Sequence, residues 1–326
     1  MNARSQIAVR VVRKHVEAEG ICSFELASAS GEPLPAFSAG SHIDVHFDVG
    51  GHGGLTRQYS LCNDPSESHR YLIAVLREGA SRGGSAAMHD AIHEGAMLAI
   101  SPPKNHFALA HDATRHLLMA GGIGITPLLC MAERLAAVGA PFEMHYATRS
   151  QARTAFAQRI GASPFAGHVQ FHFDDGDATQ KLDICVVLAA QPPGTHVYVC
   201  GPRGFMDAVI GAARSVGWAD ARIHYEYFSA DVTPQAGDGA FEVMLASSGR
   251  VIAVKPDQTV IAALAAAGVV VPTSCEQGVC GTCLTRVIAG QIDHRDSYLT
   301  PEEQAAGDQF LPCCSRAGSA RLVLDI

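Results

Sequence analysis

The sequence predicts a multidomain protein in which an antiparallel β-barrel and an α/β parallel sheet precede a C-terminal module rich in cysteine. Short strand-like runs separated by Gly, Pro and Ser fill the first hundred residues. From about residue 107, strands alternate instead with helical stretches. Five cysteines then lie in the last ninety residues. A chain of 326 residues has room for about two or three domains.

Composition excludes several classes of protein. Hydrophobic residues make up 48% of the chain and charged residues 17%, which is typical of ordered domains. The net charge of −8 argues against a nucleic-acid partner, because such a partner selects a basic face. The N-terminus is not a signal peptide, and the apolar run Val260–Val271 is too short to span a bilayer. We therefore expect a soluble cytoplasmic protein with no membrane association. Residues 238–326 hold ten acids against six Lys and Arg, an imbalance that favours a basic docking partner or simple solubility.

The barrel is predicted from five strands over the first 107 residues. Their short length and the turn residues between them are typical of small antiparallel barrels. The runs are Ile7–Arg13, Ile21–Leu26, His42–Phe47, Arg70–Leu76 and Met97–Ser101.

A short motif, Arg57-Gln58-Tyr59-Ser60-Leu61, falls on a further strand of this region. The Arg57 guanidinium suits a phosphate, the Tyr59 ring suits a flat ring system, and the Ser60 hydroxyl suits a flavin nitrogen. Any edge strand can carry these residues, so the motif alone leaves an ordinary strand open.

The run Ser81-Arg82-Gly83-Gly84-Ser85 precedes a helix predicted over residues 86–92. Glycines that open a helix offer free N–H groups to a phosphate. The alternative is a glycine turn in which Ser85 is the N-cap of the helix. The two motifs support each other, because one suits a ring and the other suits its phosphate.

The α/β region begins with a buried strand at Arg115–Ala120, followed by Gly121-Gly122-Ile123-Gly124-Ile125-Thr126-Pro127 and a helix over Leu128–Val138. A glycine-rich turn between a strand and a helix is typical of a pyrophosphate site. It departs from G-x-G-x-x-G, because Pro127 occupies the first helical turn. A tight strand–helix turn without a ligand is the alternative.

Four more strands complete the predicted parallel sheet, and they are Phe142–Thr148, Val169–Phe173, His196–Cys200 and Ile223–Tyr227. The turn Cys200-Gly201-Pro202 follows one of them and leads into a helix that ends near Val216. Nucleotides bind at the carboxyl ends of such strands. Cys200 is therefore either a small core residue or a residue that packs beside a nicotinamide near a flavin.

The cysteines Cys275, Cys280 and Cys283 have the spacing C-x4-C-x2-C, and Cys313 follows after twenty-nine residues. This plant-type ferredoxin spacing predicts a [2Fe–2S] cluster. A four-cysteine zinc site usually has two C-x2-C pairs, and disulfides are not expected without a secretory signal. The spacing selects Cys313 over Cys314, which we interpret as a small buried residue.

The last ninety residues predict a small α+β module after a linker at residues 229–239. A hairpin-like strand pair, two helices and a final strand are expected. The ranges are Phe241–Leu245, Arg250–Val254, Thr259–Ala267, a helix starting at the Thr300-Pro301-Glu302-Glu303 capping box, and Leu322–Ile326.

These motifs occur in the order that is typical of one family, together with the run His224-x-Glu226-x-Phe228. Over essentially its full length, the chain resembles the phthalate dioxygenase reductases, which include vanillate O-demethylase reductase subunits. The resemblance implies an FMN-binding ferredoxin-reductase-type β-barrel at residues 1–107, an NADH-binding α/β domain at 108–228, and a β-grasp plant-type ferredoxin at 240–326.

The resemblance also implies the sites. FMN is expected at Arg57, Tyr59 and Ser60, with its phosphate at Gly83, Gly84 and Ser85 and with Phe228 over its ring. NADH is expected at Gly121, Gly122, Gly124, Thr126, Pro127, Cys200, Gly201 and Pro202. Ser60, Thr126, Cys200 and Glu226 surround hydride transfer. NADH is favoured over NADPH by analogy, although Arg149 could meet a 2′-phosphate.

The expected function is the reductase component of a two-component Rieske oxygenase that acts on an aromatic acid or a related small molecule. Electrons pass from NADH to FMN, to the cluster and to the oxygenase, because a flavin converts a two-electron donor into one-electron steps. The family default is a monomer. The alternatives are a stand-alone NADH-dependent flavin or ferric reductase, and a redox carrier or sensor without turnover.

Overall fold

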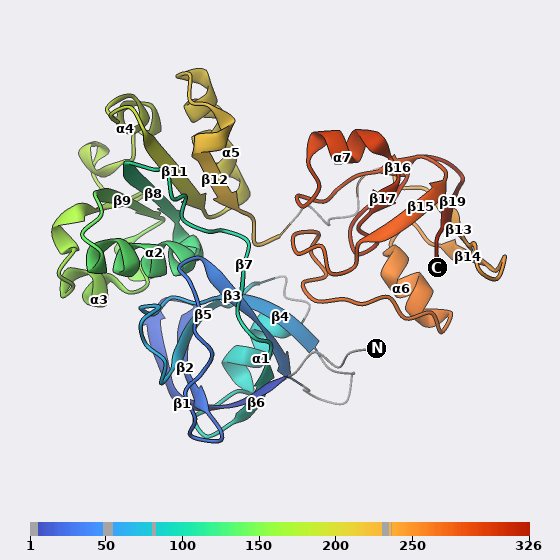
Figure 1. Ribbon diagram of the computed structural model, residues 1–326, viewed down its shortest axis with the longest axis horizontal. Coiled ribbons are helices and arrows are strands. Elements are labelled where there is room, and N and C mark those ends of the chain that lie inside the picture. The colour runs from blue at the N-terminus through green and yellow to red at the C-terminus, as the bar shows by residue number, and fades with distance from the viewer. Residues whose placement is uncertain (1–5, 48–54, 80–82, 230–234, 236) are drawn as a thin grey trace. The chain divides into compact units, whose positions relative to one another are not determined.

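The computed structural model describes residues 6–47, 55–79, 83–229, 235 and 237–326. The chain divides into two compact units, Met1–Glu226 and Tyr227–Ile326 (Figure 1). Ser81, Arg82 and most of the predicted linker lie outside the described residues. No helix within the described ranges is long and apolar enough to cross a membrane.

The first half of the first unit is an antiparallel sheet, as predicted. Its described strands have the order β4-β3-β6-β1-β2-β5, and β7 pairs with β3. The strands are β1 (Ile7–Ala18), β2 (Ile21–Ser28), β3 (Ser41–Phe47), β4 (Leu55–Ser60), β5 (Tyr71–Leu76), β6 (Met97–Ile100) and β7 (Lys104–Asn105). Alternation along the strands places residues such as Val9, Phe24 and Ile43 in one core.

The helix α1 (Gly84–Asp90) begins two residues before its predicted start. Its N-cap is Gly83, whose φ of 92° is accessible to glycine at little cost. The suggestion that Ser85 is the N-cap is therefore wrong, because Ser85 lies inside the first turn. The Met88 side chain of this helix is buried in the core of the sheet.

The second half of the first unit is a parallel sheet of order β10-β9-β8-β11-β12, which confirms the predicted α/β pattern. The strands are β8 (Arg115–Gly121), β9 (Phe142–Thr148), β10 (Val169–Phe173), β11 (Thr195–Cys200) and β12 (Ile223–Glu226). The central strands β8 and β11 are buried over nearly their whole length, as expected of a sheet covered on both faces.

Four helices cover this sheet, with α2 and α5 on opposite faces (Figure 1). The helices are α2 (Ile125–Ala137), α3 (Ala157–Gly161), α4 (Ile184–Ala189) and α5 (Arg203–Ser215). Short 3-10 turns occupy Gly122–Gly124, Gln151–Arg153, Ala166–His168, Ala178–Gln180 and Asp220–Arg222. Helix α2 starts three residues before the predicted Leu128, because Pro127 is tolerated in a first turn, where its missing N–H has no partner to lose.

The second unit is a mixed sheet of order β14-β13-β19-β15-β17 with a separate β16–β18 pair. Its elements are β13 (Phe241–Leu245), β14 (Val251–Val254), α6 (Val260–Ala266), β15 (Thr285–Ala289), β16 (Ile292–Asp293), α7 (Pro301–Ala306), β17 (Gln309–Phe310), β18 (Arg316–Ala317) and β19 (Arg321–Leu324). The predicted hairpin and the Thr300–Glu303 capping box are both confirmed.

An ionic network holds the start of the second unit. Arg295 donates to both carboxylate oxygens of Asp238, at 3.0 and 2.5 Å, and also to Asp293. Arg316 lies 3.8 Å from the same Asp238 carboxylate and donates to three backbone carbonyls. The Arg295 hydrogen bonds hold the pKa of Asp238 well below its usual range. Asp238 is therefore a fixed anchor on the body of this unit.

Candidate functional site

The two motifs predicted to hold a flavin meet in the first unit. Arg57 on β4 packs so closely on Gly84 at the start of α1 that an added Cβ would lie 2.6 Å from the Arg57 Nε. Only glycine permits this approach. Ser85 Oγ accepts a hydrogen bond from the Glu78 backbone N–H at 3.1 Å. The contact between β4 and the start of α1 therefore brings together a guanidinium, a hydroxyl and a strand that carries an aromatic ring.

Ser60 and Glu226 are 166 residues apart in sequence but adjacent in the fold. The Ser60 Oγ donates to the Glu226 Oε2 at 3.4 Å, which is a long contact. Burial raises the pKa of Glu226 to about 7, and the hydrogen bond from Ser60 lowers it only in part. A carboxyl with that pKa exchanges its proton near neutral pH.

The two glycine turns of the parallel sheet lie against each other. A Cβ on Gly124 would lie 2.2 Å from the backbone oxygen of Cys200, and a Cβ on Gly121 would lie 3.0 Å from the Pro202 ring. Cys200 is fully buried and pairs with Glu226 in the strand register. Both turns therefore open at the carboxyl edge of the sheet, which is where parallel α/β sheets bind nucleotides.

The Thr126 hydroxyl is less available for hydrogen bonding to a ligand than its motif predicts. It is 2% exposed, and its hydroxyl donates to the Ile123 carbonyl at 3.1 Å within the first turn of α2. The hydroxyl oxygen can still accept a hydrogen bond, but its proton is already engaged. Phe228 belongs to the second unit, so its predicted position over the flavin stays a prediction.

The four predicted cluster cysteines form two pairs in the second unit. Cys280 raises the pKa of the Cys275 thiol and Cys313 raises that of Cys283, so the two thiols of each pair lie close together. The neighbouring Cys275 thiol lowers the pKa of Cys280 to about 5, and Gln277 donates its N–H to the Cys275 sulfur at 3.3 Å. Two thiolates for each of two irons is the ligand set of a [2Fe–2S] cluster. In the described part of the chain, no three Cys, His, Asp or Glu side chains surround one point as ligands of a single ion would.

The backbone of the cysteine loop has the unusual conformations expected there. Gly278 and Gly281 have φ of 71° and 69°, and even Glu276 has φ of 52°. Cys314 is buried and donates its thiol to the Leu311 carbonyl at 3.6 Å, and its side chain also lies against Cys313. The ten cysteines are all free, so no disulfide competes with this arrangement. The residues present therefore fit a two-iron cluster.

The sequence pattern did not identify one feature of the carboxyl edge of the parallel sheet, where the NADH site is predicted. Asp174 and Asp175 follow β10 and lie beside the end of β9, since their N–H groups donate to the carbonyls of Thr148 and Arg149 at 3.0 and 3.2 Å. Two acidic residues directly after a predicted strand of a parallel sheet were the sequence signal that could have placed them at this edge.

Comparison with known proteins agrees with this arrangement. A model described as a 2Fe-2S iron-sulfur cluster binding domain matches residues 243–318. A second model, for the N-terminal domain of dimethylamine monooxygenase subunit DmmA-like proteins, matches residues 98–223.

Similarity to whole proteins extends over nearly the full chain. A vanillate O-demethylase oxidoreductase from Pseudomonas sp. (strain HR199 / DSM 7063) is 52% identical over 320 residues, which cover 98% of this chain and 100% of that protein. Phthalate dioxygenase reductase from Burkholderia cepacia is 39% identical and covers 98% of this chain, with 97% of its own length matched. A solved structure of phthalate dioxygenase reductase superposes with a TM-score of 0.80 at 39% identity, covering 99% of this chain and 98% of that one.

Fold, paired cysteines and relatives together define an iron–sulfur flavoprotein oxidoreductase. The matching cluster-binding domain assigns a [2Fe–2S] cluster to this chain. More narrowly, the chain belongs to the phthalate dioxygenase reductase family.

Proposed function

We propose that this chain is the reductase component of a two-component Rieske oxygenase, and that it passes electrons from NADH through FMN and a [2Fe–2S] cluster to the terminal oxygenase. The observation that carries this proposal is that a unit with two cysteine pairs follows, in one polypeptide, a unit with a nucleotide edge and a flavin-type strand. FMN and the cluster supply the conversion of a two-electron donor into one-electron transfers.

The FMN site is proposed at Arg57, Tyr59 and Ser60 on β4, with Gly83, Gly84 and Ser85 at its phosphate. The contact of Arg57 with Gly84 supports this assignment. Because Arg57 is only half-buried, its guanidinium can reach a phosphate without leaving its strand.

The NADH site is proposed at the two opposed glycine turns, with Gly121, Gly122, Gly124, Thr126 and Pro127 on one side and Cys200, Gly201 and Pro202 on the other. Asp174 and Asp175 support NADH over NADPH. Their carboxylates suit the ribose hydroxyls and repel a 2′-phosphate, which offsets the attraction of Arg149.

Glu226, Ser60 and Cys200 are proposed to line the place where the nicotinamide meets the flavin. Ser60 and Glu226 hydrogen-bond each other, so together they orient the carboxamide and exclude water. Cys200 packs as a small apolar group, since burial raises the pKa of its thiol and keeps it protonated.

The finer architecture is proposed as well. We assign an FMN-binding β-barrel to residues 1–107, which the contact between the end strands β4 and β5 supports. An NADH-binding domain at 108–228, a linker at 229–239 and a β-grasp ferredoxin at 240–326 follow. Cys275, Cys280, Cys283 and Cys313 hold the cluster, and the protein is a cytoplasmic monomer.

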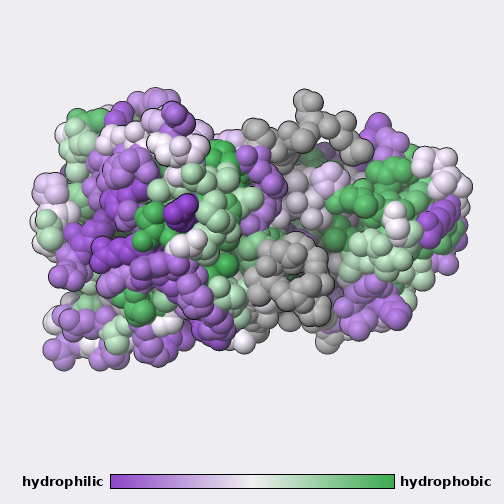
Figure 2. All heavy atoms as spheres, turned by 90° about the horizontal axis from the view of Figure 1, so that it is seen from below, coloured by the Kyte–Doolittle hydropathy of each residue, from purple (hydrophilic) through white to green (hydrophobic). Residues whose placement is uncertain are grey.

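The docking surface for the oxygenase is proposed around the cysteine loop. The Tyr298 ring covers Gly281 of this loop yet is 42% exposed, and Leu284 next to Cys283 is 38% exposed. Figure 2 shows how apolar and polar residues mix on one face of the molecule. Apolar residues close to a redox centre allow a partner to approach it without a bound water layer.

The decisive experiment separates flavin reduction from onward transfer. In Cys280→Ser, NADH should still reduce the flavin at the normal rate, whereas reduction of cytochrome c or of a Rieske partner should fall at least about tenfold. Cys185→Ser is the matched control, because Cys185 is an exposed cysteine of the first unit, outside the cluster motif, and its replacement should leave both rates unchanged. Intact onward transfer in Cys280→Ser would refute the proposed route. Equal reduction of free flavin or iron chelates with the cluster disrupted would favour the stand-alone reductase.

A further inference from the structure

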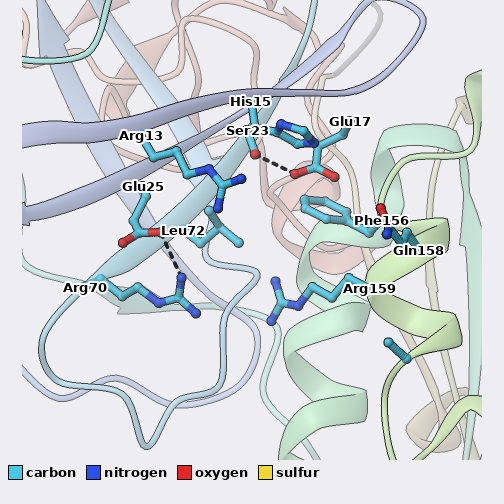
Figure 3. A pocket seen from close by; sticks show the side chains of 11 residues that line it. Arg13, His15, Glu17, Ser23, Glu25, Arg70, Leu72, Phe156, Gln158 and Arg159 are labelled. Carbon is cyan, nitrogen blue, oxygen red and sulfur yellow. Dashed lines mark hydrogen bonds and ion pairs between the residues drawn. The ribbon is translucent and has the colours of Figure 1, made fainter.

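A cavity lies in the first unit, and none of the motif residues lines it. It has a volume of about 390 Å³ and is lined by side chains of β1, β2 and the region before β5 on one side and by the α3 segment on the other (Figure 3). This volume is within the usual range for small-molecule sites, roughly 300–1,000 Å³. Leu72, Phe156 and Ala162 give it an apolar wall.

Two arginines bring hydrogen-bond donors without partners to this cavity. Arg159 donates from Nη2 to Glu133 at 3.0 Å, but its Nη1 is buried and has no hydrogen-bond partner in the described structure. Arg13 forms no ion pair or hydrogen bond with any described residue. Figure 3 shows both guanidinium groups pointing into the space between the strands and α3. A buried donor without a partner is costly, so the Arg159 Nη1 calls for an acceptor from outside the chain, and the exposed Arg13 can add a second donor.

The acids of the cavity are already engaged. Glu25 accepts from Arg70 at 2.9 Å, and Glu17 accepts from Ser23 at 2.6 Å. Three arginines, Arg13, Arg70 and Arg159, line the cavity against these two glutamates, and this excess of positive charge favours a ligand with a single negative charge. The two carboxylates in the wall also disfavour a ligand with more than one negative charge.

Strain at Phe156 adds an independent observation. This residue has φ of 60° and ψ of 13°, a left-handed conformation that bulky side chains rarely adopt, although it is only 2% exposed. The Arg159 guanidinium lies 5.9 Å from the centre of its ring. Strained residues persist where the surroundings hold them in a required position. Here the conformation holds an aromatic face directly beside a free cationic donor.

We propose that this cavity is a binding site for a flat organic monocarboxylate of about the size of benzoate. Its carboxylate accepts from Arg159 and Arg13, and its ring packs on Phe156 and Leu72. Because the strands belong to the antiparallel half of the unit and α3 to the α/β half, a bound ligand contacts both halves. This site is independent of the proposed electron route.

Titration calorimetry of the full-length, FMN-loaded protein with benzoate tests the proposal without turnover. Benzoate should bind with one site per chain, and benzamide and inorganic phosphate should each bind at least about tenfold more weakly. Arg159→Gln should weaken benzoate binding roughly tenfold, the value of one hydrogen bond to a charged group. Arg10→Gln, an exposed arginine elsewhere on β1, is the matched control and should bind as the natural chain does.

A second variant guards against a folding defect in Arg159→Gln. Gln158 is exposed at the rim of the cavity, so Gln158→Glu adds a repelling charge with little risk to the fold. It too should weaken benzoate binding, with flavin content and melting temperature unchanged. Absence of benzoate binding, equal binding of benzamide, tighter binding of phosphate, or unchanged affinity in both variants would overturn the proposal.

Discussion

At the scale of single residues, the environment of Glu226 has the clearest consequence for the stability of the fold. Its carboxyl ends β12 beside Cys200 and accepts from Ser60, which belongs to the other sheet of the same unit. Few partners stabilise its charge, so burial dominates and the pKa rises. A carboxyl that changes its protonation near pH 7 makes the stability of the fold depend on pH.

The sign of that dependence follows from linkage. Between the ordinary pKa of 4.5 and the folded value of about 7, the folded chain binds a proton that the unfolded chain has released. The contribution of Glu226 to stability is therefore complete below pH 4.5 and is lost as pH rises through 7. Glu226→Gln removes this loss, so its melting temperature should rise relative to the natural chain between pH 5 and pH 8.

The measurement is a series of thermal melts across that pH range. Glu19→Gln is a suitable control, because Glu19 is exposed and forms only a surface ion pair with Arg153. The control should follow the natural chain at every pH. If the difference in melting temperature between Glu226→Gln and the natural chain does not vary with pH, the pKa of Glu226 in the natural chain is not raised.

At the scale of elements, close backbone contacts and helix caps decide which substitutions the fold tolerates. Gly124 lies between the 3-10 turn and α2 and touches the backbone of β11. Thr300 begins α7 with a reciprocal pair of hydrogen bonds to Glu303, at 2.8 and 3.2 Å. The first contact constrains the nucleotide edge, and the second stabilises only a surface helix.

Gly124→Ala should therefore destabilise the first unit by about 1–3 kcal/mol and weaken NADH binding, because the new Cβ would collide with the Cys200 carbonyl. Chemical unfolding followed by flavin fluorescence and an NADH titration measure the two effects. Gly211→Ala, in the middle of α5 with open space around it, should be neutral or slightly stabilising. Normal NADH binding by Gly124→Ala would contradict the close contact.

Thr300→Ala should cost the second unit about 1 kcal/mol, since it removes the acceptor of the Glu303 N–H. Thr300→Ser keeps that acceptor and should restore most of the loss. Unfolding followed by the visible absorbance of the iron–sulfur cluster gives the value. NADH-driven flavin reduction should not change, and a slower rate would mean that α7 affects more than its own unit.

At the scale of the whole molecule, two units with separate cores share one chain. The second unit buries its own cluster of side chains, including Val243, Leu264 and Leu322. Independent cores predict independent unfolding. Thermal unfolding should therefore give two transitions, one in flavin fluorescence and one in cluster absorbance. In Cys280→Ser, followed by circular dichroism, only the second transition should move to lower temperature, and a single coincident transition in the natural chain would contradict this division.

Local features of the fold could be predicted from the sequence, but long-range contacts could not. Strand β9 was predicted to the residue, because an apolar run ends abruptly at Arg149-Ser150, and the α7 cap followed from four adjacent residues. Helix α3 was not predicted, since it begins at the unexpected conformation of Phe156.

The same distinction applies to the candidate site. Spacing identified the four cluster cysteines, and Cys314 was expected to be buried. The pairing of Cys275 with Cys280 depends on the folded loop. The contact of Ser60 with Glu226 and the cavity beside Arg159 join distant segments, and no local pattern reports them.

The anchoring of Asp238 by Arg295 and Arg316 has a kinetic consequence. Only twelve peptide steps separate Glu226, the last residue of the first unit, from this anchor (238 − 226 = 12). At about 3.5 Å per residue, a chain segment of that length spans at most roughly 40 Å. The first and second units of one chain therefore encounter each other at an effective concentration in the millimolar range, and this value does not depend on the concentration of the protein. Internal electron delivery should be first order and insensitive to protein concentration, whereas delivery to the oxygenase should depend on both partners.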